Sequence, residues 1–518
     1  MALRHLRTVR VVASLVFCFP FLFMFIDVTG VLPAWCMSGV TALQFIPGVV
    51  RMFSNIGAGL VGLLLVVGLT LTFGRVYCSS ICPLGTLQDF FSRLNRTRNS
   101  RRRFQFRRPN YALHYGLMVL AVSLGLGGSI FLLNVVEPFS NFGRMCVTIL
   151  RPLAILMNNG IASLLNAGHV YLLFSVPLHL PSFESIISAF LFAGGLFAAS
   201  YVRGRLFCNT LCPAGALLGL ISRASIFRIV FDRVACKDCG LCEKVCKAEC
   251  IDSGNMRIEF GACVSCYNCI EACPTTGLRY RGFRRGHSDR SPLPVNRRRR
   301  AILRGGVGAA LLVLPGRDTL KSVLPVPTGK SRSKLPISPP GSGGIERFTS
   351  RCTACHLCVS ACPTQVLTPS LLAYGPGGFL QPRMDYSVNP CTYECVLCGQ
   401  VCPSGAILPL AVEAKKLVQI GKARFVKDDC IVVTKKTECG ACSEHCPTKA
   451  VHMVKTDGLF LPEVNEELCI GCGSCEHPCP STPDKAIYVE SNPVHLAARK
   501  PETKKAEPQA APAAEFPF

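Results

Sequence analysis

Four long apolar segments, separated by longer connections, lie in the first 230 residues of the chain. Each segment comes close to the about 17–25 residues that an α-helix needs to span the hydrocarbon core of a bilayer. The four segments occupy residues 11–28, 56–73, 111–133 and 186–201. This pattern predicts an α-helical polytopic membrane domain of about four helices over residues 1–230.

Basic residues flank these segments. The chain has 56 Lys and Arg against 31 Asp and Glu, a formal net charge of +25, and 17 of these charges lie in residues 93–108 and 279–304. The positive-inside rule then puts the N-terminus, residues 74–110 and the chain after residue 203 on the cytoplasmic side of a bacterial inner membrane. A nucleic-acid-binding protein would also need a reading motif or aromatic platforms, so no nucleic-acid partner is expected.

A sequence repeat divides the membrane domain into two related halves. Residues 74–93 align without a gap with residues 204–223, and nine of these twenty positions are identical. Each copy carries the motif Gly-Arg-x2-Cys-x3-Cys-Pro-x-Gly after an apolar segment, so the helices are expected to form two repeated pairs. The thiols of the motif are Cys78, Cys82, Cys208 and Cys212.

Two interpretations are open for these four thiols. Soft thiolates at positions i and i+4 near a membrane surface could bind copper or iron, or form a redox-active disulfide. Alternatively, they are packing thiols at a helix start, where Pro83 and Pro213 occupy the first turn. Because both halves carry the pair, we favour a function and leave its chemistry open.

The 32 cysteines fall in short runs with metal-ligand spacing, unlike the scattered cysteines of a disulfide scaffold. Residues 231–283 contain two runs of the bacterial two-cluster ferredoxin type, in which the fourth Cys of each run binds the other cluster. Four-thiolate zinc is the alternative, but triplets followed by Cys-Pro fit zinc poorly. One [4Fe–4S] cluster is therefore assigned to Cys236, Cys239, Cys242 and Cys273, and the other to Cys263, Cys266, Cys269 and Cys246.

Residues 345–490 repeat this theme four times. Their sixteen thiolates provide for four more [4Fe–4S] clusters, which makes six in the chain and predicts two α+β ferredoxin-like domains. Cys430 is the least certain ligand, because eight residues separate it from the next Cys. A series of redox centres in one chain indicates electron transfer. The four runs are Cys352/Cys355/Cys358/Cys362, Cys391/Cys395/Cys398/Cys402, Cys430/Cys439/Cys442/Cys446 and Cys469/Cys472/Cys475/Cys479.

An arginine-rich linker, residues 284–344, joins the two Cys-rich regions, and a Pro- and Ala-rich tail at 491–518 is expected to be disordered. Residues 299–304 resemble a twin-arginine export signal and precede a short apolar run at 305–316. Export of a folded iron–sulfur domain would put residues 345–490 in the periplasm. A short fifth membrane helix or a cytoplasmic linker are the alternatives.

The whole arrangement resembles two known families in succession. Residues 1–280, with the duplicated Cys-x3-Cys-Pro motif followed by a two-cluster ferredoxin, resemble the NapH-type membrane quinol dehydrogenase component of periplasmic nitrate reductase systems. Residues 297–490, with the twin-arginine-like segment and four Cys runs, resemble the NapG-type four-cluster ferredoxin of the same systems. The chain thus looks like a natural fusion, a polyferredoxin of anaerobic respiration. The resemblance implies quinol oxidation and electron delivery from the quinone pool through the clusters to a periplasmic reductase or cytochrome.

Family resemblance also bears on the exchange of cysteines between runs and on a second function. Resemblance to the four-cluster ferredoxin subunits of molybdenum oxidoreductases implies exchange of the last Cys between runs one and four and between runs two and three. The spacing also allows exchange between neighbouring runs.

Candidate acceptors of quinol protons are His169, His179 and Glu137, with Glu184 in the same outer connection. Haem is disfavoured, because His114 lies at a different depth from the other histidines. Related membrane ferredoxins serve nitrous oxide respiration or copper-oxidase maturation, so a redox or metal-handling maturation factor is the alternative function.

Overall fold

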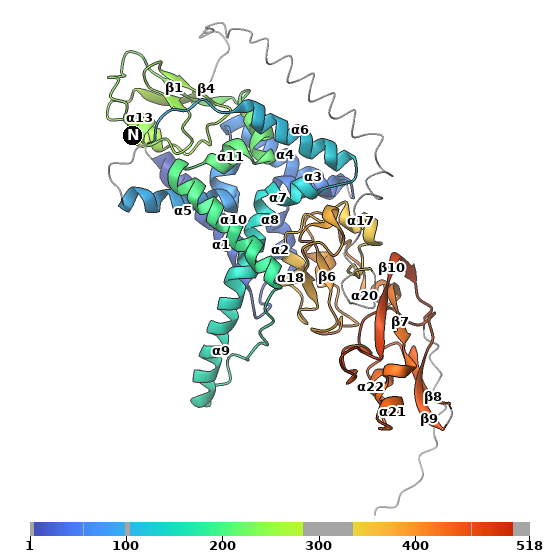
Figure 1. The fold of residues 1–518 in the computed structure, drawn as a ribbon. Helices are drawn as coiled ribbons and strands as arrows, with labels where there is room; N and C mark the ends of the chain where they lie inside the picture. Colours follow the sequence, from blue (N-terminus) through green and yellow to red (C-terminus); the bar gives the residue numbers. More distant parts are fainter. Residues whose placement is uncertain (1–4, 55, 99–103, 283–334, 457, 501–518) are drawn as a thin grey trace, which may run out of the picture.

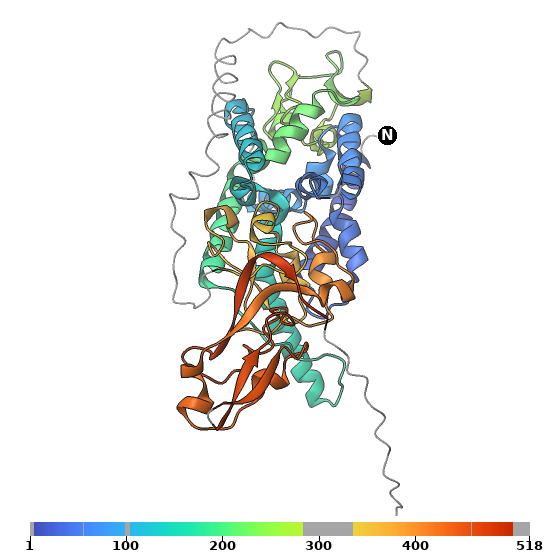
Figure 2. The same ribbon diagram turned by 90° about the vertical axis from the view of Figure 1, so that its right-hand side faces the viewer.

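The computed structural model describes residues 5–54, 56–98, 104–282, 335–456 and 458–500. A helical domain occupies the middle of the molecule, and two ferredoxin-like domains lie at its opposite ends (Figures 1 and 2). The first ferredoxin domain, residues 227–282, lies near the N-terminus of the chain, and the second comprises residues 335–498. The two Cys-rich regions are therefore separated in space as well as in sequence.

The helical domain contains long helices joined by short helices and single π-helical turns. Its elements are α1 (His5–Ile26), α2 (Ala34–Thr41), α3 (Phe45–Met52), α4 (Ile56–Phe73), η2 (Tyr77–Ile81), α5 (Pro83–Arg98), α6 (Tyr111–Leu126), α7 (Phe131–Val136), α8 (Pro138–Met145), η3 (Cys146–Leu150), α9 (Arg151–Ala167), α10 (Phe183–Arg203), α11 (Leu206–Thr210) and α12 (Pro213–Ser222).

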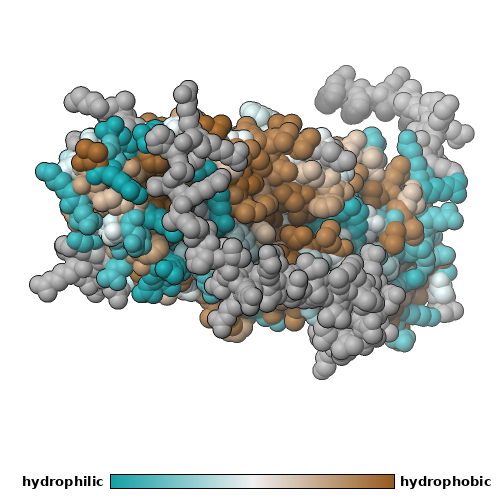
Figure 3. Space-filling view, turned by 90° about the horizontal axis from the view of Figure 1, so that it is seen from above, coloured by the Kyte–Doolittle hydropathy of each residue, from teal (hydrophilic) through white to brown (hydrophobic). Residues whose placement is uncertain are grey.

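Three helical stretches among the described residues are long and apolar enough to cross a membrane. They are α1, the continuous stretch Pro138–Ala167 made by α8, η3 and α9, and α10, and shorter apolar helices accompany them. Hydrophobic side chains cover the middle of the face seen in Figure 3, and hydrophilic ones gather toward its two ends. This distribution suits a bilayer around the helices and water around the ferredoxin domains.

The structure corrects two of the predicted segments. The segment expected at 111–133 is broken, because α6 ends at Leu126 before a glycine turn in which Gly128 has a φ of +85°. The connection after residue 133 was expected to be an outer loop but contains the 30-residue stretch Pro138–Ala167. Sequence reasoning missed this helix because Arg144 and Arg151 interrupt its apolar pattern.

The two sequence repeats have matching backbones. Helices α4 and α10 both end at a glycine in the left-handed region, Gly74 with a φ of +80° and Gly204 with a φ of +60°. The chain then turns into η2 or α11, and Pro83 and Pro213 begin the next helices, α5 and α12. Proline suits this position because the first turn of a helix needs no backbone N–H donor.

The first ferredoxin domain is built from two antiparallel strand pairs and two short helices. Strand β1 begins at Phe227, four residues before the predicted boundary, and pairs over its whole length with β4. The elements are β1 (Phe227–Phe231), α13 (Leu241–Lys244), β2 (Ile251–Asp252), β3 (Arg257–Ile258), α14 (Asn268–Ala272) and β4 (Leu278–Gly282), with β2 paired to β3.

The second ferredoxin domain contains three antiparallel strand pairs, β5–β6, β7–β10 and β8–β9. Its elements are α17 (Ile345–Thr349), α18 (Leu357–Ser360), β5 (Leu367–Pro369), η4 (Pro376–Gly378), β6 (Pro382–Met384), α19 (Leu397–Gln400), α20 (Val412–Lys415), β7 (Val418–Phe425), η5 (Lys427–Asp429), α21 (Ile431–Thr434), α22 (Ala441–Glu444), β8 (Val451–Thr456), β9 (Leu459–Val464) and β10 (Ile487–Ala497).

One boundary of the second domain differs from the expectation. Strand β10 continues to Ala497, where its last residues pair with the start of β7, so the tail predicted from residue 491 is structured over its first residues. The twin-arginine-like segment at 299–304, the apolar run at 305–316 and the tail from residue 501 lie outside the described residues.

Polar contacts hold each ferredoxin domain to the helical domain. At one end, Asp89 on α5 forms ion pairs with Arg10 of α1, Arg205 of the second repeat and Lys247 of the first ferredoxin domain. At the other end, the Arg144 Nε donates to the Ala354 carbonyl oxygen at 2.9 Å. The charged side chains at both contacts are buried, so neither contact is a weak pair on the surface.

Candidate functional site

The Cys runs of standard spacing share one backbone conformation. On both sides of the second Cys of such a run, a residue adopts the left-handed conformation, as Ala354 and His356 do around Cys355. Backbone N–H groups in consecutive turns of this kind converge on one point and favour a bound anion. The same conformation occurs at Asp238/Gly240, Ser265/Tyr267 and Gly471/Gly473.

In the first ferredoxin domain, the structure brings together the thiols that were predicted to share a cluster. Cys236 and Cys273 lie within electrostatic range of Cys242. We call these three thiols, together with Cys239 of the run that contains Cys236 and Cys242, site A. Site B surrounds a small cavity lined by Cys246, Cys263, Cys266 and Cys269, and also by the spare Cys250. The Sγ atoms of Cys250 and Cys246 are 3.5 Å apart, so Cys250 is a buried thiol in the wall of site B.

In the second ferredoxin domain, exchange takes place between neighbouring runs. Cys402, the last Cys of run two, lies within electrostatic range of the first three thiols of run one. Cys362, the last Cys of run one, lines a cavity with three thiols of run two. The expected exchange between runs one and four is therefore wrong. Site C comprises Cys352, Cys355, Cys358 and Cys402, and site D comprises Cys362, Cys391, Cys395 and Cys398.

Runs three and four form the other two sites in the same way. Cys446 lines a cavity with Cys469, Cys472 and Cys475, which we call site E. Cys479 lies within electrostatic range of Cys430 and Cys442, and these form site F together with Cys439. The irregularly spaced Cys430 is buried against the other thiols despite its distance in sequence.

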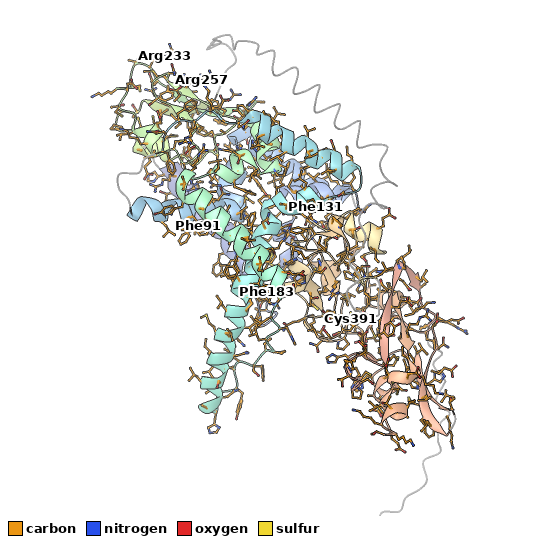
Figure 4. The ribbon with its side chains drawn as sticks, viewed as in Figure 1. Phe91, Phe131, Phe183, Arg233, Arg257 and Cys391 are labelled. Carbon is orange, nitrogen blue, oxygen red and sulfur yellow. The ribbon has the colours of Figure 1, made fainter. Side chains whose placement is uncertain are left out.

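Sites C to F lie in a linear order. Cys398 of site D is within electrostatic range of Cys402 of site C. The Cys391 backbone N–H donates to the Cys472 carbonyl oxygen at 2.9 Å, which joins sites D and E. Cys475 of site E is within range of Cys442 of site F. Figure 4 shows Cys391 at the middle of this series, between the helical domain and the far end of the second ferredoxin domain.

The thiol sets suit clusters better than single ions. In the part of the chain that the structure describes, no three His, Cys, Asp or Glu side chains lie close enough together to hold one metal ion. In a cubane each thiolate binds a different iron, so its ligands stand further apart than those of a tetrahedral zinc ion. The residues present therefore fit [4Fe–4S] clusters, which supply one-electron redox chemistry when bound.

The structure separates the three candidate acceptors of quinol protons. His179 lines a cavity of about 600 Å³ between the starts of α9 and α10 and the second ferredoxin domain, as does Glu184. His169, just after the end of α9, does not line this cavity. Glu137 is buried at the N-terminus of α8, where its carboxylate accepts from the backbone N–H groups of Phe139 and Ser140. Glu137 thus caps a helix and does not face the cavity.

The fold and the thiol sets define an iron–sulfur protein of the ferredoxin type. Comparison with known families finds a 4Fe–4S dicluster domain at residues 351–406 and 436–482, which matches the neighbouring pairs of runs. A second family, described as a 4Fe–4S binding domain, matches residues 56–102 and 185–232, the two copies of the repeat.

Similarity to known proteins shows the family to which the chain belongs. The chain is 31% identical to the ferredoxin-type protein NapF of Escherichia coli over 157 residues, 30% of this chain and 87% of the relative. It is 32% identical to the E. coli ferredoxin-type protein NapG, over 28% of this chain and 67% of the relative. It is 30% identical to the methylamine utilization ferredoxin-type protein MauM of Methylorubrum extorquens, over 36% of this chain and 86% of the relative. The chain belongs to this family of ferredoxin-type 4Fe–4S proteins. No solved structure matches it significantly.

Proposed function

We propose that this protein is a membrane-bound quinol dehydrogenase component. Quinol is oxidised to quinone at the cavity beside the second ferredoxin domain, releasing two protons and two electrons. The electrons enter the series of [4Fe–4S] clusters one at a time and leave from site F to a periplasmic reductase. Relatives of the Nap type favour a nitrate reductase as the acceptor, and the NapH-like character of the helical domain is part of the same proposal.

The main support for placing the two ferredoxin domains on opposite sides of the membrane is the way α1 connects them. Near its start, Arg7 forms an ion pair with Glu271 of the first ferredoxin domain. Near its end, the Met24 carbonyl oxygen accepts a hydrogen bond of 3.3 Å from Ser360 of the second. Seventeen residues of helix span about 25 Å at a rise of about 1.5 Å per residue, close to the hydrocarbon thickness of a bilayer. The two domains are thus a membrane's thickness apart.

The cavity that contains His179 has the composition of a quinol site. Its wall combines apolar residues such as Val147 and Ile155 with the polar groups of Arg151, His179 and Glu184. Quinone sites need an apolar slot for the ring and nearby groups that accept protons. Its volume of about 600 Å³ suits a substituted quinone ring.

Site D lies directly behind this cavity. Leu367 lines both the cavity and the thiol pocket of site D. Arg151, in the cavity wall, donates to the Val359 carbonyl oxygen at 3.0 Å and is within electrostatic range of Cys362. Electrons from quinol would therefore reach a cluster across a single layer of side chains.

Cluster reduction by quinol tests the proposal. Purified, cluster-loaded protein in lipid nanodiscs is mixed with ubiquinol and menaquinol analogues, and cluster bleaching is followed by stopped flow. We expect the double variant His179→Ala/Glu184→Gln to slow reduction about tenfold or more, because proton acceptors contribute at least about 10²-fold in such sites. The matched control is His169→Ala, outside the cavity. If neither quinol bleaches the clusters, the proposal fails.

A reporter fusion after Lys500 tests the topology separately. The fusion follows the end of β10, so it leaves the second ferredoxin domain intact. We expect the reporter to be active in the periplasm, and to become cytoplasmic when Arg299 and Arg300 are both changed to Lys. A cytoplasmic reporter on the unchanged chain would remove the periplasmic acceptor from the proposal.

A further inference from the structure

We propose that Cys78, Cys82, Cys208 and Cys212 together hold one further iron–sulfur cluster, which links the two ferredoxin domains through the helical domain. We call this group of residues the four-thiol site. The inference goes beyond the function proposed above, because it concerns a metal centre within the helices and does not depend on quinol oxidation.

The first support is the convergence of the two repeats. All four thiols are buried, with at most 4% of any residue exposed. Cys78 and Cys208 are within electrostatic range of Cys82, and the other three thiols are within range of Cys212. Each repeat supplies only two thiols, and a cluster with four protein ligands needs four. One site shared by the two repeats meets that requirement.

Reciprocal arginines join the two halves. The Arg75 Nη2 lies 3.8 Å from the Cys78 Sγ and donates to the Cys208 carbonyl oxygen at 3.3 Å. In the same way, the Arg205 Nη1 lies 3.9 Å from the Cys208 Sγ and donates to the Cys78 carbonyl oxygen at 2.7 Å. The two repeats therefore contact each other reciprocally around the four-thiol site.

Other N–H groups already point at the sulfur atoms. The Gln88 Nε2 lies 3.2 Å from the Cys208 Sγ, and the Gly215 backbone N–H donates to the Cys212 Sγ at 3.3 Å. Such N–H donors stabilise thiolates and set the potential of a bound cluster. A pair of packing thiols would have no need of them.

Buried charge gives an independent argument. Arg10, Arg75, Arg205 and Lys247 are each at most 5% exposed, and Asp89 is the carboxylate that pairs with three of them. Arg75 makes no ion pair among the described residues, and its Nε and the Nη2 of Arg205 have no hydrogen-bond partner there. Buried cations are costly without a counter-charge. An iron–sulfur cluster with four thiolates is anionic and supplies it.

The position of the four-thiol site suggests its role. Toward the first ferredoxin domain, the Arg75 Nη1 donates to the Gly261 carbonyl oxygen at 3.0 Å, and Arg75 is within electrostatic range of Cys263 in site B. Toward the second domain, Tyr77 is within range of both Cys82 and Glu137, and Glu137 is within range of Cys355 in site C. The four-thiol site thus fills the gap between sites B and C.

Iron stoichiometry tests whether one shared site exists. We expect the loaded full-length protein to contain about 28 iron atoms per chain with a seventh cubane, against about 24 with six. The pairs Cys78→Ala/Cys82→Ala and Cys208→Ala/Cys212→Ala should each lose about four iron atoms, and the quadruple variant should lose no more than either pair. The control pair is Cys18→Ala/Cys36→Ala. Unchanged iron, or a quadruple loss twice that of either pair, overturns the proposal.

A redox titration followed by electron paramagnetic resonance covers the case in which the alanine variants do not fold. Arg75→Gln keeps every thiol and removes one positive charge beside the four-thiol site. We expect it to shift a single cluster signal to lower potential and to leave the others unchanged, because the reduced cluster carries the additional negative charge. If no signal shifts, or if all shift together, the proposal is wrong. These readouts do not use quinol, so their failure is distinct from failure of the proposed function.

Discussion

A single glycine permits a close backbone contact within each of the two repeats. A Cβ atom at Gly215 would lie against the carbonyl oxygen of Cys208, and one at Gly85 would meet the carbonyl oxygen of Cys78. Both glycines are in the repeated motif, two residues after its proline. The motif therefore specifies a close backbone contact as well as the thiols.

Substitution of Gly215 by Ala should destabilise the four-thiol site. The added methyl group has no room, so we expect a loss of about 1–3 kcal/mol in the free energy of unfolding and a loss of iron from the helical domain. Thermal unfolding and iron analysis measure the two effects. Gly194→Ala on α10 is the matched control, because its Cβ would meet nothing within 4 Å. Equal behaviour of both variants would contradict the expected contact.

The stability of the second ferredoxin domain should depend on His495. Burial lowers the pKa of His495 to about 4, whereas an unfolded histidine titrates near about 6.5. The unfolded state therefore takes up the proton first. The contribution of His495 to stability is complete above pH about 6.5 and falls by up to about 1 kcal/mol per pH unit as the pH drops toward 4. Burial lowers the pKa of His356 in the same domain to about 3, so His495→Gln should weaken the pH dependence of unfolding without abolishing it. The exposed His445→Gln should leave the dependence unchanged.

At the scale of elements, α5 is one of the connections between the helical domain and the first ferredoxin domain. Its Asp89 pairs with three buried cations, so Asp89→Asn leaves them without a carboxylate. We expect a loss of about 3 kcal/mol or more in the free energy of unfolding. Glu271→Gln breaks the half-exposed pair with Arg7 and should cost less than about 1 kcal/mol. Comparable losses in the two variants would contradict the assigned importance of burial.

Iron loss can also test the exchange of cysteines between runs. The double variant Cys362→Ala/Cys398→Ala removes two ligands of site D and should lose about four iron atoms. In contrast, Cys362→Ala/Cys358→Ala affects sites C and D and should lose about eight. Equal losses of about eight iron atoms in both variants would support exchange between distant runs, because Cys358, Cys362 and Cys398 would then belong to three different clusters.

The sequence predicted which thiols group together in the first ferredoxin domain but not in the second. Cys spacing was enough to assign the runs, because a cubane imposes that spacing locally. Exchange between runs depends on how strands such as β7 and β10 pair, which the spacing does not contain. The stretch Pro138–Ala167 was missed because an arginine such as Arg144 is typical of a loop. Only the structure shows that Arg144 donates to the carbonyl oxygen of Ala354. Convergence of the two repeats was likewise invisible, since it is a contact between residues about 130 positions apart.

At the scale of the whole molecule, the proposed series of clusters runs from site A to site F with the four-thiol site in the middle. With the proposed topology, a reductant that does not cross the bilayer has access only to the first ferredoxin domain in inverted membrane vesicles. We expect it to reduce the clusters of both domains in the unchanged protein. In Cys82→Ala/Cys212→Ala, reduction should stop after the two clusters of sites A and B. Full reduction in that variant would show that electrons do not need the four-thiol site.

The contact between Arg144 and Ala354 bears on the order of biogenesis. The buried Arg144 guanidinium donates to the carbonyl oxygen of Asn134 within the helical domain and to that of Ala354, next to Cys355, in the second ferredoxin domain. Helices inserted before the second ferredoxin domain arrives would lack the second of these acceptors. If the loop around site C folds on its cluster, iron supply would then limit completion of the membrane part of the protein as well as its redox activity.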